Sequence, residues 1–380
     1  VPIIGILSQP VYDGAYQYIA ASYVKWLESA GAAAIVIPYD ADESLTREIF
    51  SQINGVLFPG GGDKAIPPTA QLMWNLAVDY NQRGEFFPMW GTCLGFEFMV
   101  TMAAGDDSDG IPVIESGFNA ENISMPLIFP TVEDEIRTKG VFSTQSDLYS
   151  TATIRDTLST HNITMNNHQR GITPSRFMRN TNLTDMFHVT STNFDLDGRE
   201  FVSTIEAKDF PFYGVQFHPE KNNFEYGLRQ RLSHQSGSEG SPYPSSTESS
   251  SHISSLPIPF EAINHSEEAV DFSIHLSRFF VSQTRKSTIG KYTLAEEHPL
   301  LYNYPVHVGT NFEQIYLITS AHATMPSKSG WSRFDGTSGR SSATSTKIQR
   351  KSGLVQPRAR LRGSAMAHNT DANETTILDA

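Results

Sequence analysis

The chain has 380 residues, of which 39% are hydrophobic and 18% are charged, so it can bury a sizeable core and is not a wholly disordered protein. Its formal charge of −13 argues against nucleic acid as a partner, because binding phosphates requires a positive face. No apolar run reaches the roughly 18 residues of a membrane-spanning helix, and a single cysteine cannot form an intramolecular disulfide.

The first hundred residues alternate between strand-like and helix-like segments. Helical spacing of apolar side chains occurs over residues 18–30, which end at Gly31, and over residues 72–80. Short apolar runs typical of buried strands occupy residues 2–7, 34–38, 53–58 and 86–90. This alternation predicts an α/β fold with a doubly wound, mainly parallel sheet, helices on both faces and flavodoxin-like layering. Ligands of such sheets bind at the carboxyl ends of the strands.

Two further strands are expected over residues 201–205 and 212–217, and the second ends at His218. Residues 227–256 then include 11 serines among 30 residues and almost no large apolar side chains. Such a segment cannot bury enough surface to offset the entropy lost on ordering, so we expect a disordered insertion.

Globular character resumes at Pro257, with a helix expected over residues 267–283 and a last strand over residues 314–318. Residues 321–380 are rich in serine and glycine and hold 9 Lys/Arg against 4 Asp/Glu, which predicts a disordered basic tail. We therefore expect one catalytic α/β domain made of residues 1–226 and 257–320.

The segment PMWGTCLGFE, residues 88–97, carries the only cysteine. An apolar strand stops at a glycine, Cys93 follows two positions later, and a helical pattern starts at once. This G-x-C-x-G spacing is typical of a strand-turn-helix elbow that exposes a nucleophile. The helix N-terminus would stabilise a thiolate, and the backbone N–H of Leu94 would stabilise an oxyanion. A buried structural cysteine is the alternative.

The segment YGVQFHPE, residues 213–220, places His218 at the end of an apolar strand and Glu220 two residues further on. A cysteine nucleophile needs a base that takes its proton, and the base needs an acceptor that fixes its tautomer. Cys93, His218 and Glu220 supply these three roles.

A third element is the glycine run that follows the strand at residues 53–58. Glycine lets backbone N–H groups approach a ligand closely, so Gly61 and Gly62 are candidates for the second oxyanion donor and for substrate contact. A phosphate-binding loop is excluded because no G-K-[ST] follows at the required spacing. A plain tight turn remains the alternative.

These motifs together resemble the γ-glutamyl hydrolase family, the folate-polyglutamate hydrolases of the class I glutamine amidotransferase-like superfamily. The resemblance rests on PGGG, GTCLGFE, YGVQFHPEKNNFEY and YIAASYVKWLESAGA. It covers residues 2–226 and resumes over 257–319. Within it, HPEKNNFEY is similar to the family form HPEK-x-x-[YF]-E-[WY].

The resemblance also implies roles for single residues. Cys93 matches the nucleophile, His218 the base and Glu220 the carboxylate that orients it. Glu97 matches a position beside the glutamyl group of the substrate, and His168, in MNNHQ, matches a second histidine of the cleft. Read alone, Glu97 could be a solvated helix residue and His168 a surface loop histidine.

The implied reaction is hydrolysis of the γ-glutamyl bonds of folate poly-γ-glutamates through a γ-glutamyl thioester, with no metal or organic cofactor. The expected partner is a small-molecule substrate, and the family suggests a homodimer. One alternative is a glutaminase of the amidotransferase type, or a hydrolase of other γ-glutamyl amides. Another is a non-catalytic glycoprotein that binds folate polyglutamate in the same cleft.

The sequence also bears on where the protein acts. It opens at Val1 without an initiator methionine, so we expect that a leader preceded it. Asn-x-Ser/Thr acceptors for glycans occur at Asn122, Asn162, Asn182, Asn264 and Asn373. Together these features predict a glycoprotein of the lysosome or vacuole, or a secreted one.

Overall fold

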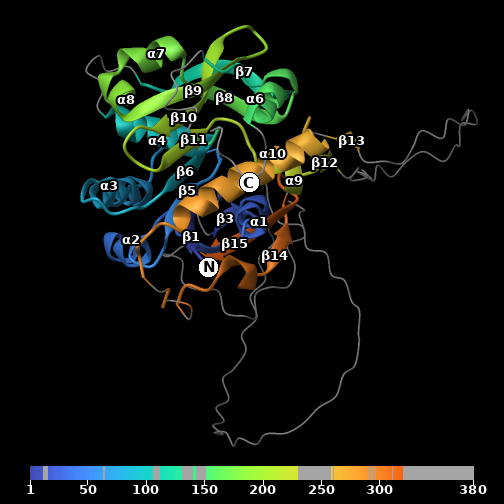
Figure 1. Ribbon diagram of the computed structural model, residues 1–380. Coiled ribbons are helices and arrows are strands. Elements are labelled where there is room, and N and C mark those ends of the chain that lie inside the picture. Colours follow the sequence, from blue (N-terminus) through green and yellow to red (C-terminus); the bar gives the residue numbers. More distant parts are fainter. Residues whose placement is uncertain are drawn as a thin grey trace, which may run out of the picture.

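The described elements of the chain are arranged around one seven-stranded sheet (Figure 1). The computed structural model describes residues 1–11, 16–62, 65–105, 112–130, 140–142, 151–229, 258–259, 261–290, 292–293, 295, 297–309 and 311–319. Most of the serine-rich segment at 227–256 and the whole tail at 321–380 therefore lie outside the described residues, and the predictions made for them stay predictions.

The central sheet has the strand order β4-β1-β5-β6-β11-β10-β9. Neighbouring strands from β4 to β11 are parallel, whereas β10 runs antiparallel to both β11 and β9. The prediction of a mainly parallel sheet is confirmed. The strands are β1 (Ile3–Leu7), β4 (Ala33–Ile37), β5 (Gly55–Phe58), β6 (Met89–Thr92), β9 (Phe187–Phe194), β10 (Glu200–Ala207) and β11 (Phe212–Val215).

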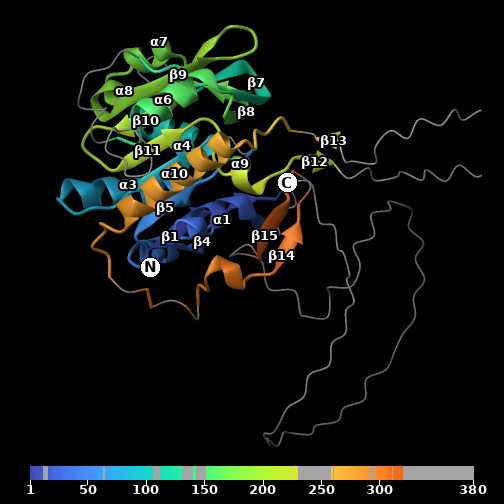
Figure 2. The same ribbon diagram turned by 45° about the vertical axis from the view of Figure 1, so that its right-hand side comes forward.

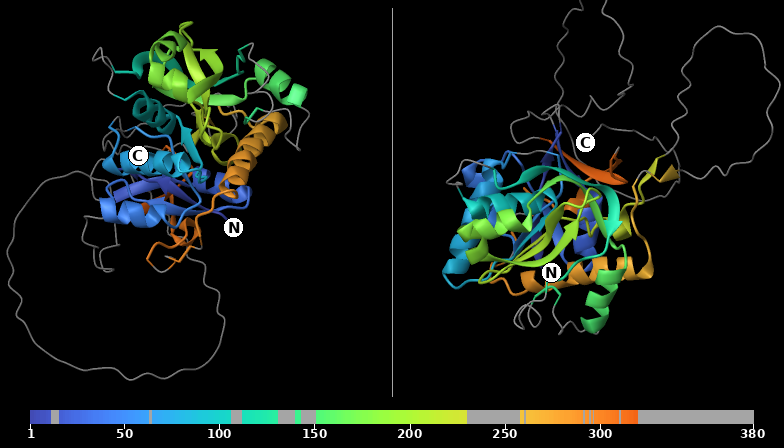
Figure 3. Two further views of the ribbon diagram at one scale, coloured as in Figure 1. Left: turned by 60° about the vertical axis from the view of Figure 1, so that its left-hand side comes forward. Right: turned by 90° about the horizontal axis from the view of Figure 1, so that it is seen from above.

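Helices cover both faces of this sheet (Figure 3), as the alternation of strands and helices predicted. Side chains alternate between the faces, so Ile3 and Leu7 of β1 join one core and Ile4 and Ile6 join the other. The helices are α1 (Ala21–Ser29), α2 (Glu43–Phe50), α3 (Pro68–Gln82), α4 (Leu94–Ala104), α6 (Thr151–Thr160), α7 (Pro174–Arg179), α8 (Thr181–Met186), α9 (Lys221–Phe224) and α10 (Glu267–Thr284), with a 3₁₀ turn at Leu301–Asn303.

The two layers are formed by different helices. Helices α2, α3 and α4 pack on the face that carries Ile3 and Leu7, and α1 and α10 pack on the other. On the second face Trp90 of β6 lies between Trp26 of α1 and Phe280 of α10, with ring centroids 5.3 and 5.6 Å away. Burial on both faces explains why these strands read as nearly continuous apolar runs.

The helix expected over residues 18–30 is only partly correct. Residues Tyr16–Ala20 form strand β3, and α1 starts at Ala21. Strand β3 pairs antiparallel with β15 (Gln314–Thr319), so that Ile19 faces Tyr316. This pairing with a strand almost 300 residues away overrides the local helical spacing, because cross-strand contacts and burial decide strand formation.

Strand β15 belongs to a second, antiparallel sheet with the order β14-β15-β3-β2. Figure 2 shows β14 and β15 of this sheet beside α1. The short strands are β2 (Gln9–Pro10) and β14 (Val306–Val308), and a separate two-stranded pair consists of β12 (Leu228–Arg229) and β13 (Ile258–Pro259).

A region that the sequence patterns did not predict lies at the other end of the molecule, at the top of Figure 1. Strands β7 (Glu115–Met125) and β8 (Thr164–Gly171) form an antiparallel pair beside α7, α8 and β9. The backbone N–H of His218 donates to the carbonyl of Met165 at 2.8 Å, which ties β8 to the segment that follows β11. Strand β8 therefore contributes side chains beside the carboxyl ends of the central strands.

No helix within the described ranges is long and apolar enough to cross a membrane.

Candidate active site

Cys93 occupies the sharp turn between β6 and α4. Its backbone has φ 51° and ψ −105°, a left-handed conformation that only one other non-glycine residue, Asn122, shares within the described part of the chain. The N–H of Cys93 donates to the carbonyl of Val215 at 2.8 Å, so the turn is held against β11. A cysteine in this unfavourable conformation is typical of a nucleophile elbow.

The glycines on either side of Cys93 are required by close packing. A Cβ atom built on Gly91 would lie 2.6 Å from the carbonyl oxygen of Gly95, and one on Gly95 would overlap the carbonyl of Phe58. The N–H of Gly95 also donates to the carbonyl of Pro59 at 3.1 Å. The G-x-C-x-G pattern is thus required because the start of α4 packs closely against β5 and β6.

His218 and Glu220 lie in the loop between β11 and α9. Nδ1–H of His218 donates to Oε1 of Glu220 at 2.8 Å, and the two side chains are only 8% and 1% exposed. Burial alone would lower the pKa of His218, but the charges of Glu220 and Cys93 and a hydrogen bond with Cys93 raise it to about 10. The structure therefore brings the thiol and the carboxylate together on one imidazole.

Tyr23 of α1 is a site residue that the sequence patterns did not reveal. Its hydroxyl accepts the N–H of Gly60 at 2.8 Å and lies 3.3 Å from Nδ1 of His218. Desolvation and the neighbouring charge of Glu220 raise the pKa of Tyr23 well above 10, so the hydroxyl keeps its proton. Within an amphipathic helix Tyr23 resembles any core aromatic residue, and only its distant partners identify it.

The glycine loop lies beside the start of α4. A Cβ on Gly60 would come within 2.6 Å of the His218 ring, and one on Gly61 would lie 3.1 Å from Leu94 and would overlap the side chain of Gln9. The two segments expected to supply oxyanion donors, at Gly61 and Leu94, are therefore adjacent. Gly62 differs, because a Cβ there would meet nothing within 4 Å.

Glu97 is buried and forms an ion pair with Arg170 of β8, so it is not a solvated helix residue. His168 is also buried, in β8 and not in a surface loop. Its Nδ1–H donates to the carbonyl of Arg170 at 2.7 Å, which fixes the tautomer and leaves Nε2 as an acceptor with no hydrogen-bond partner among the described residues. Burial, with a contribution from the charge of His218, lowers the pKa of His168 to about 4.

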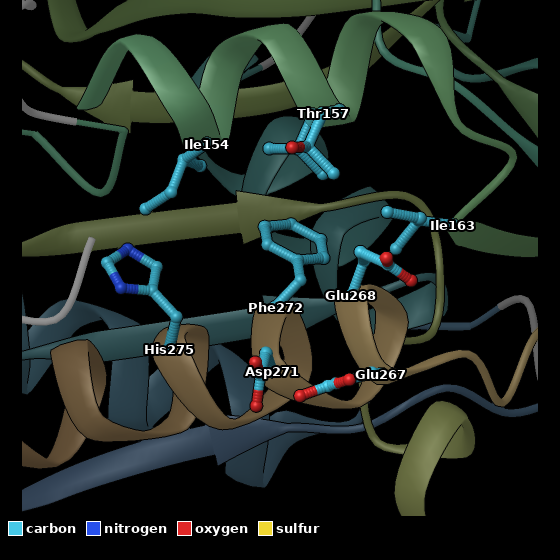
Figure 4. Close-up of a pocket in the computed structure, with 9 residues that line it drawn as sticks. Ile154, Thr157, Ile163, Glu267, Glu268, Asp271, Phe272 and His275 are labelled. Atoms are coloured by element: carbon cyan, nitrogen blue, oxygen red, sulfur yellow. The ribbon is translucent and has the colours of Figure 1, made fainter. Parts of the chain in front are cut away.

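A pocket of about 160 Å³ between α6 and α10 (Figure 4) contains none of these residues. Its lining includes the apolar side chains of Leu158, Ile163 and Phe272 and the acidic side chains of Glu267 and Asp271. Across the described ranges, no cluster of three or more His, Cys, Asp or Glu side chains could hold a metal ion. The groups that the structure brings together around His218 are a thiol, an imidazole and a carboxylate.

The model of the peptidase C26 family matches residues 2–220, which include every predicted site residue. Gamma-glutamyl hydrolase B of Dictyostelium discoideum is 36% identical over 84% of this chain and 84% of its own length. Gamma-glutamyl hydrolase of Homo sapiens is 32% identical over 83% of this chain and 89% of its own length.

A fainter likeness, with a TM-score of 0.40 and 15% identity, relates 58% of this chain to 86% of the solved glutaminase domain of Trypanosoma brucei CTPS.

Proposed function

Since this chain belongs to the peptidase C26 family, we propose that it is a cysteine hydrolase that cleaves the γ-glutamyl bonds of folate poly-γ-glutamates. The observation that carries the proposal concerns the imidazole of His218. It is hydrogen-bonded both to the Cys93 thiol and to the Glu220 carboxylate. The named γ-glutamyl hydrolases among the relatives, at 30–36% identity, support the substrate class.

The first half of the reaction follows from the roles of three side chains. The Cys93 thiolate attacks the γ-carbonyl carbon, and the electron pair moves onto the carbonyl oxygen. Backbone N–H groups of Leu94 and Gly61 stabilise this oxyanion. The oxyanion collapses, the C–N bond breaks, and the His218 imidazolium gives its proton to the leaving amine.

The second half regenerates the thiol. Water attacks the γ-glutamyl thioester, His218 takes a proton from that water, and the C–S bond breaks to release the carboxylate product. Glu220 accepts the Nδ1–H of His218 throughout, which leaves Nε2 as the nitrogen that exchanges protons. The raised pKa of His218, about 10, keeps the ring protonated until the leaving amine needs the proton.

The direct test compares two substrates under one set of conditions. We expect release of glutamate from pteroyl pentaglutamate, and little release of ammonia from free glutamine. Ammonia as the main product would instead favour an amidotransferase-type glutaminase. Tight binding of pteroyl pentaglutamate without any product would favour the third hypothesis, a non-catalytic binding glycoprotein.

The location and assembly of the protein are further parts of the proposal. Asn122 and Asn162 are exposed glycan acceptors, which supports a lysosomal, vacuolar or secreted glycoprotein. A homodimer is proposed on the family resemblance. Removal of N-linked glycans from the protein made in a eukaryotic secretory host should lower its apparent mass, and light scattering should give the mass of a dimer.

A further inference from the structure

We propose that Arg170 binds the α-carboxylate of the glutamyl residue whose γ-carbonyl is attacked, and that Glu97 is the positioning residue that orients the guanidinium. This inference rests on the proposed function and adds the cation that it requires. A poly-γ-glutamate carries one α-carboxylate per residue, whereas the whole chain has a formal charge of −13. Recognition therefore needs a local positive group beside the reacting atoms.

Glu97 places its ion pair with Arg170 close to the nucleophile. It is four residues after Cys93 on α4, and its N–H donates to the carbonyl of Cys93 at 3.0 Å. Cys93 directly precedes α4, so this hydrogen bond holds Glu97 about one helical turn, roughly 5 Å, from the nucleophile. In a glutamyl group three single bonds separate the γ-carbonyl carbon from the α-carbon, so its carboxylate reaches about one helical turn from the attacked atom.

The backbone of Arg170 is held by a hydrogen bond from His168. The carbonyl of Arg170 accepts Nδ1–H of His168 at 2.7 Å, and His168 lies close enough to His218 for the charge of the latter to act on it. The backbone of Arg170 is thus held in β8, which contacts the His218 loop, and its guanidinium is held by Glu97 of α4, which follows the nucleophile. A cation fixed in this way loses little entropy when a substrate binds.

The guanidinium also retains room for a second carboxylate. Its pairing with Glu97 is through Nη2, and the arginine side chain is 19% exposed. Arginine offers five N–H donors in a planar fork, so one edge can hold Glu97 while another takes a substrate carboxylate.

Two other cations of this region are less suitable. The ammonium of Lys221 is 4% exposed and paired with buried Glu261. Arg199 is paired with Glu115 and lies over the ring of Phe118 at 3.9 Å.

An α-carboxylate suits the site better than an α-ammonium would. In a folate polyglutamate the nitrogen of each glutamyl residue is acylated, so it carries no charge. The residue whose γ-carbonyl is attacked therefore has one ionised group, its α-carboxylate. A guanidinium beside the glutamyl group therefore discriminates between residues with a free carboxylate and residues in which it is blocked.

The test uses two substrates that differ at one group. The first is p-aminobenzoyl-γ-glutamyl-γ-glutamate, and the second has an α-carboxamide in place of the α-carboxylate on the residue that supplies the attacked carbonyl. We expect the wild-type protein to cleave the first with a kcat/KM about 10- to 100-fold higher, the value of a hydrogen bond to a charged group. Arg170→Gln should reduce this ratio to about threefold or less, and Arg170→Lys should restore part of it.

The ratio of the two rates is measured on one preparation, so a loss of folded protein cancels. Glu97→Gln should also lower the ratio, because a guanidinium without its orienting partner binds less selectively, whereas a purely structural role would slow both substrates by one factor. Arg47→Gln is the matched control, since it removes an Arg–Glu pair of α2 and should keep the wild-type ratio.

Three results would overturn the inference. Equal cleavage of both substrates by the wild-type protein would reject it and leave the hydrolase intact, as would a wild-type ratio in Arg170→Gln. Cleavage of neither substrate, nor of pteroyl pentaglutamate, would reject the proposed function along with it.

Discussion

Two buried carboxyl groups, one in the loop after β11 and one on the neighbouring strand β10, have opposite surroundings. Glu220 follows β11 and faces the protonated ring of His218, 2.8 Å from its Nδ1. Glu206 on β10 accepts one N–H from Val141 at 2.9 Å, and burial raises its pKa to about 7 although that N–H and the charge of Arg155 oppose the shift. Glu220 lies beside a cationic partner, whereas burial favours the protonated form of Glu206.

This difference separates the carboxyl group of the proposed active site from a buried carboxyl group outside it. Pairing costs stability, because both partners are removed from water, and it is retained where the pair has chemistry to perform. No chemical role is proposed for Glu206, the buried carboxyl group of β10. The following variants test this distinction, from the largest expected effect to the smallest.

Cys93→Ala removes the proposed nucleophile. We expect the rate of glutamate release to fall by about 10⁴-fold or more, because nucleophile and base act as a unit. The fold should persist, since the thiol contributes little packing volume at the turn, and far-ultraviolet circular dichroism should match the wild-type spectrum. Residual hydrolysis above about 1% of the wild-type rate would reject Cys93 as the nucleophile.

Glu220→Gln keeps the shape of the paired region and removes its charge. The charge of Glu220 is the first cause that raises the pKa of His218, so that pKa should fall, and the loss of the imidazolium should occur at lower pH. We expect kcat/KM near neutral pH to fall roughly 10³-fold, with the alkaline limb of its pH profile displaced toward acid. An unchanged alkaline limb would mean that Glu220 does not set the protonation of His218.

Glu206→Gln tests the buried carboxyl group whose pKa is raised. The folded pKa of about 7 exceeds the ordinary value of 4.5, so Glu206 favours the folded state fully below pH 4.5, and this contribution is lost as pH rises through 7. The variant should equal the wild type near pH 4 and exceed its unfolding free energy by up to ~3 kcal/mol at pH 8. Urea unfolding at both pH values measures this, and a difference independent of pH would contradict it.

Arg47→Gln sets the baseline for a charge pair in water. Arg47 and Glu43 are 53% and 71% exposed on α2, one turn apart. Screening by solvent should limit the loss of unfolding free energy to about 0.3–0.5 kcal/mol, and salt should reduce it further. A loss comparable to that expected from the buried groups would show that exposure does not separate these pairs.

The sequence was most informative where one local segment carries the chemistry. The strand, the turn and the helix around Cys93 are contiguous, and the small residues that the turn requires are visible as Gly91 and Gly95. His218 was also recognisable, because it closely follows an apolar strand and precedes Glu220 by two residues, although β11 itself ends at Val215. The alternation of buried strands and helices predicted the parallel sheet for the same reason, since periodicity is a local property.

Contacts between distant segments were not predictable. Strand β3 forms because β15 pairs with it, and Tyr23 joins the site because α1 brings it to Gly60 and His218. The β7–β8 pair has a mixed burial pattern with two register shifts, so it shows no clean alternation in the sequence. Such features depend on the partner surface more than on local propensity.

By itself the sequence determined the parallel α/β sheet, the elbow at Cys93 and the histidine and carboxylate that follow β11. Tertiary structure alone decided that Arg170 pairs with Glu97, that His168 presents Nε2 as an acceptor, and that burial leaves Glu206 with a raised pKa. The physical reason is that backbone spacing is written along the chain, whereas the dielectric surroundings and the partner of a charged side chain exist only once distant segments have packed together.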